Sequence, residues 1–387
     1  MSSWTLNSPP YRISKTIDMV EECINVTVYE AEALVYSTGD KFNTIVILPL
    51  FLLVGLAGNG AFLIVMMKVP NMQTATNGYL VNLAVADIMF LVFAVSEKII
   101  YLIASPIVID KSVFGSTGCA VVEMAISTSY FASLFFITLV TTERYYAVCT
   151  PHERHDTKKK SVIKIILAWI VAGILSSTLL GSLLEKFEVC ILWPDGYEHF
   201  PTHIMQCNYV KLWMSVYGSF LQGFLFIIVF LANTLMYFKI VCALGERLQL
   251  KRDDYACLKR DKNVQLRNQI TRTVIINGCA FFFCLAPIEF SSIFYGISDI
   301  NNHPILNPNQ RKRLVFVVRA LLYINAIINP IIYICTSPRY REAFKTVFCG
   351  KKNQDDVAIA NSSITQQTHG SSMRSKRTLQ TTQETSC

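Results

Sequence analysis

Long apolar stretches alternate with short charged segments along most of the 387-residue chain. Each stretch exceeds the roughly 20 helical residues needed to cross a hydrocarbon core of about 30 Å. A representative one, NTIVILPLFLLVGLAGNGAFLIVMMK, is apolar around its whole circumference, unlike an amphipathic soluble helix. The pattern predicts an all-α membrane protein, a seven-transmembrane helix bundle. We expect the spans at residues 43–68, 78–104, 117–149, 162–184, 212–241, 268–296 and 313–336.

The apolar pattern divides the chain into four parts: an N-terminal segment at 1–42, the bundle at 43–336, a short helix at 337–349 and a tail at 350–387. The short helix begins with a Ser-Pro start signal and carries its apolar residues on one face, so we expect an amphipathic interfacial helix on the inner leaflet. Cys349 at its end is a palmitoylation site or a free thiol. The tail has almost no large apolar residues and is predicted to be disordered.

Lysine and arginine gather in the links at 150–161 and 242–267 and in the tail, and cytoplasmic flanks carry such an excess. This orientation places the N-terminus outside the cell in a multi-pass plasma-membrane protein, although Arg311-Lys312-Arg313 would then also lie outside. Asn25 begins an Asn-Val-Thr glycosylation sequon on the outer segment. The net charge of +8 is explained by contact of the basic flanks with the lipid bilayer, so nucleic acid binding is not required.

Four of the 12 cysteines, Cys23, Cys119, Cys190 and Cys207, lie on the predicted outer side, where one or two disulfides are expected. No cysteine or histidine group has the spacing of a metal site, and no nucleophile and base share one membrane face. The sequence therefore argues against an enzyme.

Several polar residues interrupt the apolar spans, where they are costly and mark functional positions. Asp87, Ser133, Asn325 and Asn329 offer oxygen ligands for Na⁺, although their spacing alone favours a hydrogen-bonded cluster without an ion. Pro287 and Pro330 each remove a backbone hydrogen bond and predict kinks in the last two spans. Such kinks serve either packing geometry or movement.

Over residues 43–349 the chain resembles the rhodopsin-like (class A) G protein-coupled receptors, because several short motifs occur in the expected order. They are GNG with Asn59, LAVAD with Asp87, Cys119, ERY at 143–145, Trp169, Tyr237, FFFCLAP and NPIIY at 329–333.

The resemblance implies an activation switch at the inner end of the bundle. Glu143 would hold Arg144 at rest, and on activation Tyr237 and Tyr333 would move towards Arg144 while a heterotrimeric G protein docks. Arg267 stands where many relatives have an acidic residue, so basal activity is expected to be higher. The other expected switch residues are Tyr145, Phe281, Leu285, Pro287, Asn329 and Pro330.

The resemblance also carries expectations about ions, disulfides and inner partners. It favours Na⁺ at the four oxygen residues as an allosteric ion, with no other cofactor. It pairs Cys119 with Cys207 and leaves Cys23 and Cys190 for a second bridge. Serine and threonine residues in the tail would be targets of receptor kinases and would recruit arrestin.

The ligand is expected to be an extracellular peptide. Ile126 occupies the position where amine receptors carry aspartate, and no lysine suits retinal attachment. Several charged residues lie at outer depth and favour a ligand with a cationic group. An internal salt bridge between Glu97 and Arg319 is an equal alternative to direct ligand contact by these two residues. The expected ligand-binding residues are Glu97, Glu123, Ile126, Ser127, Tyr130, Glu289 and Arg319.

The motifs SPRYREAFKTVFCG and FFFCLAP resemble the neuropeptide branch that contains thyrotropin-releasing hormone, neuromedin U, ghrelin and FMRFamide-like receptors. A receptor for a lipid or another small molecule is the alternative within the class. A secondary transporter is a more distant alternative, because the chain shows no internal repeat.

Overall fold

The computed structural model describes residues 23–150, 158–180, 187–206, 212–252, 261–301, 306 and 308–350. It divides into two units, Met1–Ser337 and Pro338–Cys387, which are considered separately.

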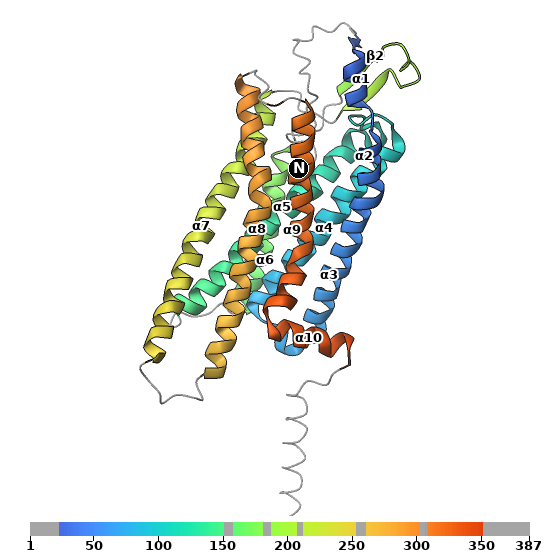
Figure 1. Ribbon diagram of the computed structural model, residues 1–387. Coiled ribbons are helices and arrows are strands. Elements are labelled where there is room, and N and C mark those ends of the chain that lie inside the picture. The colour runs from blue at the N-terminus through green and yellow to red at the C-terminus, as the bar shows by residue number, and fades with distance from the viewer. Residues whose placement is uncertain are drawn as a thin grey trace, which may run out of the picture. The chain divides into compact units, whose positions relative to one another are not determined.

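The first unit contains seven helices that are long and apolar enough to cross a membrane, as counted over the described residues, and the predicted seven-helix bundle is confirmed. Figure 1 shows them side by side. Their bounds are α3 (Leu48–Lys68), α4 (Ala75–Ala104), α5 (Gly115–Cys149), α6 (Lys158–Ser177), α7 (Leu212–Arg252), α8 (Asp261–Asn301) and α9 (Pro308–Thr336).

Several helix ends differ from the predicted spans for local reasons. The first span begins before residue 43, because α2 (Thr38–Phe42) continues through a π turn, η1 (Asn43–Ile47), into α3. A capping box starts it: the Ser37 hydroxyl accepts from the Asp40 N–H, and the Asp40 carboxylate accepts from the Ser37 N–H. Helices α7 and α8 run on into polar sequence beyond the predicted apolar limits, since charged residues such as Lys and Arg are good helix formers.

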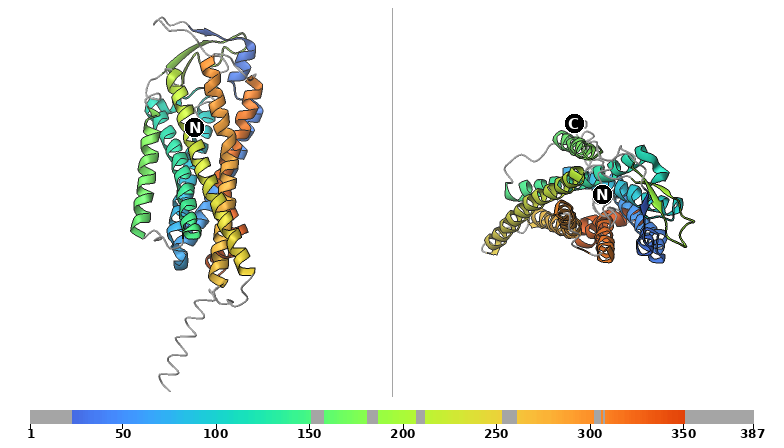
Figure 2. Two further views of the ribbon diagram at one scale, coloured as in Figure 1. Left: turned by 90° about the vertical axis from the view of Figure 1, so that its left-hand side faces the viewer. Right: turned by 90° about the horizontal axis from the view of Figure 1, so that it is seen from above.

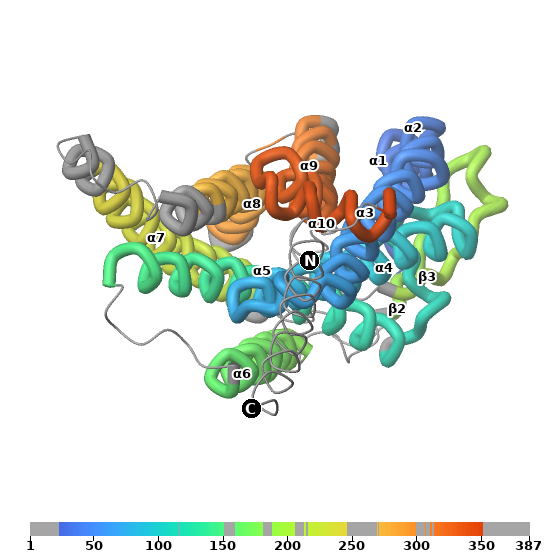
Figure 3. The backbone as a smooth tube through the Cα atoms, turned by 90° about the horizontal axis from the view of Figure 1, so that it is seen from below, coloured from blue at the N-terminus to red at the C-terminus, as the bar shows by residue number. Residues whose placement is uncertain are grey.

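Helix α5 is the central helix of the bundle, because it packs against α4, α6, α7 and α8. Helix α3 lies between α4 and α9, and α8 lies between α7 and α9. The right-hand view of Figure 2 and Figure 3 show this order from the two ends. Short 3₁₀ turns, η2 (Pro70–Met72) and η3 (Ser112–Phe114), precede α4 and α5.

The interruption at Pro330 in α9 is compensated by a residue of α3. Proline has no N–H, so the Ala326 carbonyl one turn earlier loses its helical donor. The Asn59 amide donates to that carbonyl at 2.8 Å and to the Gly55 carbonyl of its own helix at 3.0 Å. Asn59 is fully buried, where a polar side chain needs hydrogen-bond partners. Its amide finds them in these two carbonyls, one of which is the carbonyl that Pro330 leaves without a donor.

Two glycines allow close approach between helices. A Cβ on Gly278 of α8 would lie 1.8 Å from the Tyr237 hydroxyl of α7, and a Cβ on Gly55 of α3 would lie 2.2 Å from Leu91 Cδ1 of α4. Both distances are far below van der Waals contact. The Tyr237 ring can lie against α8 because residue 278 has no side chain.

One end of the bundle carries a small folded layer, which we call the cap: residues 23–37, 105–111 and 187–206. Strand β1 (Ile24–Asn25) pairs in parallel with β2 (Phe187–Leu192), and β2 pairs antiparallel with β3 (His203–Gln206). A disulfide joins Cys23 to Cys190. Figure 1 shows α1 (Val28–Leu34) beside β2. Apolar side chains from all three segments form a separate core of Val26, Ala31, Ile107, Val189, Ile191 and Ile204.

The second unit contains α10 (Pro338–Phe348), in agreement with the short helix predicted at 337–349. Phe344 and Phe348 lie one turn apart with ring centroids at 6.0 Å, as expected for an apolar face. Gly350 has a φ of 65°, a left-handed conformation that suits the end of a helix. Its location on a membrane surface remains a prediction.

Candidate ligand and signalling sites

A buried carboxylate joins three helices in the half of the bundle below the cap. The Glu289 side chain of α8 has no exposed surface. Its Oε1 atom accepts a hydrogen bond from the Tyr130 hydroxyl of α5 at 2.6 Å and another from the Gln222 amide of α7 at 2.7 Å. Its Oε2 atom has no hydrogen-bond partner among the described residues.

This arrangement leaves one oxygen of a buried carboxyl group without a hydrogen bond in a low-dielectric setting. A buried carboxylate needs hydrogen bonds at both oxygens or a compensating cation to offset the loss of water. Tyr130 and Gln222 supply donors to one oxygen only. The remaining oxygen is therefore suited to accept from a charged donor that enters from outside the chain.

The predicted ligand-binding residues of α5 share one face. Glu123, Ile126, Ser127 and Tyr130 follow the i, i+3, i+4, i+7 spacing of a single helical stripe and are all at least nine-tenths buried. The structure thus aligns Glu123 with the Glu289 cluster along α5. Arg319 lies on α9 and is half-buried.

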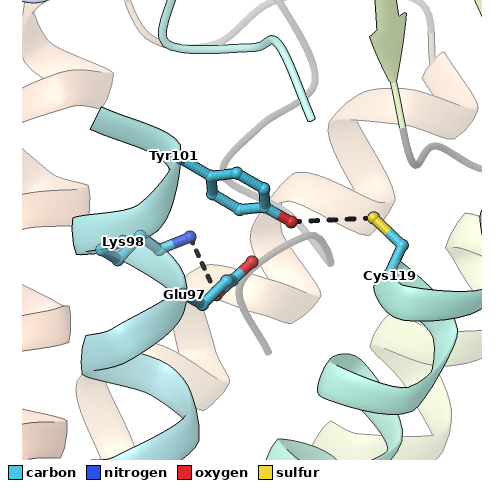
Figure 4. Close-up of polar contacts among 4 residues, drawn as sticks. All are labelled: Glu97, Lys98, Tyr101 and Cys119. Carbon is cyan, nitrogen blue, oxygen red and sulfur yellow. Dashed lines mark hydrogen bonds and ion pairs between the residues drawn. The ribbon is translucent and has the colours of Figure 1, made fainter. Parts of the chain in front are cut away.

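A second charged group lies on α4, where Glu97 is almost fully buried. Lys98 Nζ lies 3.3 Å from Glu97 Oε2, and both Glu97 and Arg319 act electrostatically on Lys98. The Tyr101 ring extends from the next turn of α4 towards Cys119 at the start of α5 (Figure 4). The Tyr101 hydroxyl lies 3.6 Å from Cys119 Sγ. Because Cys119 is disulfide-bonded, its sulfur can only accept.

The predicted sodium residues form a cluster rich in acceptors. The Asn329 amide donates to Asp87 Oδ2 at 2.7 Å, and Ser133 also interacts with this carboxylate. Asn325 Oδ1 and Asn329 Oδ1 are buried without a donor among the described residues. These oxygens outnumber the donors around them, so the residues fit a small hard cation such as Na⁺.

At the opposite end of the bundle, Arg144 and Tyr237 bond to neighbouring helices. Arg144 Nη2 donates to the Thr76 hydroxyl of α4, and the Tyr237 and Thr141 hydroxyls are 2.9 Å apart across α7 and α5. Tyr333 packs its ring 5.0 Å from that of Phe62 of α3. Each of the two switch tyrosines is thus held by a different neighbour.

The remaining predicted switch residues lie beside Arg144 and along α8. Glu143 is nine-tenths buried beside Arg144 in the sequence, and Phe281 and Leu285 of α8 are almost completely buried. Pro287 lies inside α8, between Leu285 and Glu289. The Tyr145 ring lies 5.8 Å from the Lys239 ammonium of α7. Helix α8 therefore carries both the buried Glu289 carboxylate and the predicted switch residues Phe281, Leu285 and Pro287.

The sequence matches the family model described as 7 transmembrane receptor (rhodopsin family) over residues 58–333. The chain belongs to this family. The rhodopsin-family resemblance predicted from the motifs is confirmed, and the family is one of receptors rather than enzymes. Signalling through G proteins is general in it.

The sequence is similar to those of several known receptors over most of its length. It is 26% identical over 339 residues to the thyrotropin-releasing hormone receptor of Mus musculus, covering 83% of this chain and 82% of that one. It is 26% identical over 333 residues to galanin receptor 2a of Danio rerio, covering 83% of each. It is 23% identical over 350 residues to the tachykinin-like peptides receptor 86C of Drosophila melanogaster, covering 87% of this chain and 64% of that one.

The structure describes some of the predicted disulfides and modification sites of the receptor. The Cys23–Cys190 disulfide left open by the sequence is present. Cys119 is disulfide-bonded, and its predicted partner Cys207 lies outside the described residues, as does the tail at 351–387. Arg267 lies on α8. Asn25 is exposed on β1, and Cys349 is an exposed free cysteine. Glycosylation and palmitoylation at these positions stay predictions.

Two ionisable groups of the cap have shifted pKa values. Burial, followed by the nearby Asp40 carboxylate, raises the pKa of Tyr36 to about 12. Backbone N–H groups of Glu198 itself and of Gly196 lower the pKa of the Glu198 carboxyl. Glu198 thus keeps its negative charge at neutral pH on the exposed β2–β3 hairpin.

Several residues around the receptor's sites are missing from the predicted set. Gln222 and Thr76 are ordinary polar residues whose roles depend on the rotation of their helices. Lys98 follows Glu97 directly, so the pair was visible in the sequence. The capping-box pattern Thr-x-x-Glu at Thr27 and Glu30 marked the start of α1.

Proposed function

We propose that this chain is a plasma-membrane receptor for an extracellular peptide with a basic group, and that it activates a heterotrimeric G protein. The cap and N-terminus then face outside, and the Arg144 end faces the cytoplasm. Basic residues in the links next to that end support the orientation. The three relatives are receptors for peptides or peptide hormones, which supports a peptide ligand.

The Glu289 cluster is the observation that carries the ligand class. One carboxylate oxygen is satisfied by α5 and α7, and the other has no partner among the described residues. An arginine or lysine side chain, or an N-terminal amine, donates charge-assisted hydrogen bonds that would complete it. An apolar lipid would leave it half satisfied.

The same contacts explain how binding is transmitted. Glu289 lies two residues after Pro287, where α8 lacks a backbone hydrogen bond. A cation that draws Glu289 away from Tyr130 or Gln222 changes the packing of α8 against α5 and α7. The ligand shifts the equilibrium only by the difference between its affinities for the two arrangements, and a shift from 1:99 to 99:1 needs about 5.5 kcal/mol.

At the inner end, release of Arg144 from its neighbours opens the G protein site. Thr76 holds Arg144, and Thr141 holds Tyr237. In this proposal an outward movement of α8 frees Tyr237, which lies over Gly278. Receptor kinases and arrestin then act on the tail.

Sodium is the proposed allosteric ion. Asp87, Ser133, Asn325 and Asn329 would hold it, because their oxygens outnumber the nearby donors. The ion would supply the positive charge that the buried Asp87 carboxylate otherwise lacks. A hydrogen-bonded cluster is less favoured than an ion because two amide oxygens are left without donors.

The test is a calcium and cAMP screen of cells expressing the full chain against an amidated neuropeptide library, with lipid and amine panels in parallel. Active peptides should carry a basic group. In cells expressing Glu289→Gln, their potency should fall about 30-fold, since breaking a buried charge pair costs about 2 kcal/mol or more.

Glu198→Gln is the matched control, because it removes an exposed carboxylate from the β2–β3 hairpin and should leave potency unchanged. Surface labelling checks that each variant reaches the membrane. Activation by lipids or amines alone would contradict the peptide assignment. Equal potency on wild type and Glu289→Gln would remove Glu289 from the binding site.

A further inference from the structure

The cap end of the bundle contains a buried ammonium group that neither the predicted site nor the proposed function uses. Lys111 lies in the segment between α4 and η3 and is only 3% exposed. Its backbone N–H donates to the Met205 carbonyl of β3 at 2.8 Å, which fixes the residue beneath the hairpin. Its Nζ has no hydrogen-bond acceptor among the described residues.

Lys111 shares an aromatic ring with a second lysine. Its Nζ lies 5.5 Å from the centroid of the Tyr101 ring, and Lys98 Nζ lies 5.7 Å from the same centroid. Two positive groups therefore converge on one ring. Lys98 is partly exposed, with 16% of its side chain accessible.

The ring between the two lysines is held in a fixed position. The Tyr101 hydroxyl is bound to Cys119 Sγ, as Figure 4 shows, and the Phe114 ring packs edge-on at 5.3 Å. Burial on α4 immobilises the rest of the side chain, because Tyr101 is 3% exposed. The geometry around the ring is thus preorganised, which favours binding of a matching group.

No nearby acidic residue among those described forms a hydrogen bond with Lys111 Nζ. Glu97 is bound to Lys98 at 3.3 Å, and Asp110 uses one oxygen to accept the Ser112 N–H. Glu123 and Arg319 also act on Lys98. The face of an aromatic ring attracts a cation only weakly compared with the loss of water on burial. The three N–H donors of the Lys111 ammonium therefore lack an acceptor among the described residues.

We propose that Lys111 and Lys98, above Tyr101, bind a carboxylate of the ligand. A carboxylate has four acceptor sites and can bridge two ammonium groups, whereas a C-terminal amide would bring donors towards donors. This deepens the proposed function and rests on it. The ligand then carries a basic group at Glu289 and an acidic group at the cap end, its C-terminal carboxylate or an acidic side chain.

The first experiment needs no peptide. The full-length receptor is purified as wild type, Lys111→Met and Lys41→Met, and the thermal midpoint is measured in sodium acetate and in sodium chloride at equal ionic strength. Met keeps the length of the side chain and removes the charge. Lys41 is an exposed lysine of α2 on the same side and serves as control.

Two results are expected in chloride and acetate. Lys111→Met should have a higher midpoint than wild type in chloride, because a buried group without an acceptor is removed. Acetate should raise the midpoint of wild type and of Lys41→Met but not of Lys111→Met. A lower midpoint for Lys111→Met would show a structural role, and an equal acetate effect in all three proteins would place acetate elsewhere; either result overturns the proposal.

The second experiment identifies the source of the carboxylate. Arginine-containing pentapeptides are made as C-terminal acids, as amides, and as amides with an internal Asp, and are tested in cells. Peptides with a carboxylate should be at least about tenfold more potent than their neutral partners on wild type, a ratio worth about 1.4 kcal/mol. The ratio should fall to about one on Lys111→Met and on Lys98→Met.

Dependence on the C-terminal acid or on the internal Asp tells the two sources apart. Equal potency of acid and amide on wild type, or an unchanged ratio in both variants, would overturn the proposal. If no peptide activates the receptor, the proposed function fails, and the acetate measurement alone decides whether Lys111 binds an anion.

Discussion

Single buried polar residues determine most of what this receptor is able to do. Asn59 supplies the hydrogen bond that Pro330 removes, and Glu289 holds three helices through one carboxylate oxygen. Each lies at a buried position where an apolar side chain would cost less free energy. Asn59 satisfies a carbonyl of the neighbouring helix, and in the proposed function Glu289 accepts a hydrogen bond from the ligand.

Asp87 gives the residue-scale prediction. Sodium that binds only the folded receptor should raise its stability by about 1.4 kcal/mol at ten times the dissociation constant. We expect the thermal midpoint of the wild-type protein to rise when choline chloride is replaced by sodium chloride at constant ionic strength. Asp87→Asn should abolish this rise, because it removes the only charged ligand of the cluster.

Asp195→Asn is the control, because Asp195 is exposed on the β2–β3 hairpin. It should keep the full sodium effect. A sodium response that survives in Asp87→Asn would place the ion somewhere else, and the absence of any response in wild type would favour a purely hydrogen-bonded cluster.

At this scale the sequence reveals which residues are unusual but not which partners they have. Asp87 and Glu289 stand out because a carboxylate in an apolar helix is costly. Gln222, Thr76 and Lys111 could not be assigned in the same way. Their roles depend on how far each helix is rotated and tilted, and short-range patterns do not determine that.

At the scale of elements, the cap links the N-terminal segment to two loops of the bundle. Strand β1 pairs with β2, the Cys23–Cys190 disulfide closes a separation of 167 residues, and Val35 bridges to Ile107. The small apolar core beneath these contacts makes them mutually dependent. The folded structure of the cap thus depends on contacts between segments that are far apart in the chain.

The cap should loosen when its disulfide is removed. The double variant Cys23→Ser, Cys190→Ser loses a cross-link over a long loop, an effect of about 2–4 kcal/mol in typical domains. We expect a lower thermal midpoint and faster cleavage of the N-terminal segment in limited proteolysis. Cys279→Ser, which changes an exposed free cysteine of α8, should match wild type.

Unchanged proteolysis in the double variant would mean that strand pairing and the Val26 core hold the cap without the disulfide. The single variants Cys23→Ser and Cys190→Ser should then behave like wild type as well.

Helices and cap differ in how far the sequence predicts them. The seven spans follow from apolar length alone, because the hydrocarbon thickness sets it. The ends of α7 and α8 were missed because their polar extensions are helical without being apolar. The pairing of β1 with the β2–β3 hairpin was not predicted, because β1 is two residues long and pairs with a segment far along the chain.

For the whole molecule, the structure supports one path from the cap end to the Arg144 end. Helix α8 carries Glu289, Pro287, Leu285, Phe281 and Gly278 in turn, and at Gly278 it meets the ring of Tyr237. Tyr237 bonds to Thr141, one turn before Arg144 on α5. In the proposed mechanism, a displacement of α8 at Glu289 would reach the Arg144 end through these packed side chains.

The central claim is that peptide binding outside is converted into nucleotide exchange inside. It is tested most directly by measuring peptide-stimulated exchange on heterotrimeric G protein with the purified receptor in nanodiscs, as wild type and as Arg144→Ala. The account predicts at least about tenfold stimulation by the wild type and none by Arg144→Ala, with peptide binding retained. Equal exchange with both proteins, or binding by the wild type without exchange on any G protein class, would contradict it.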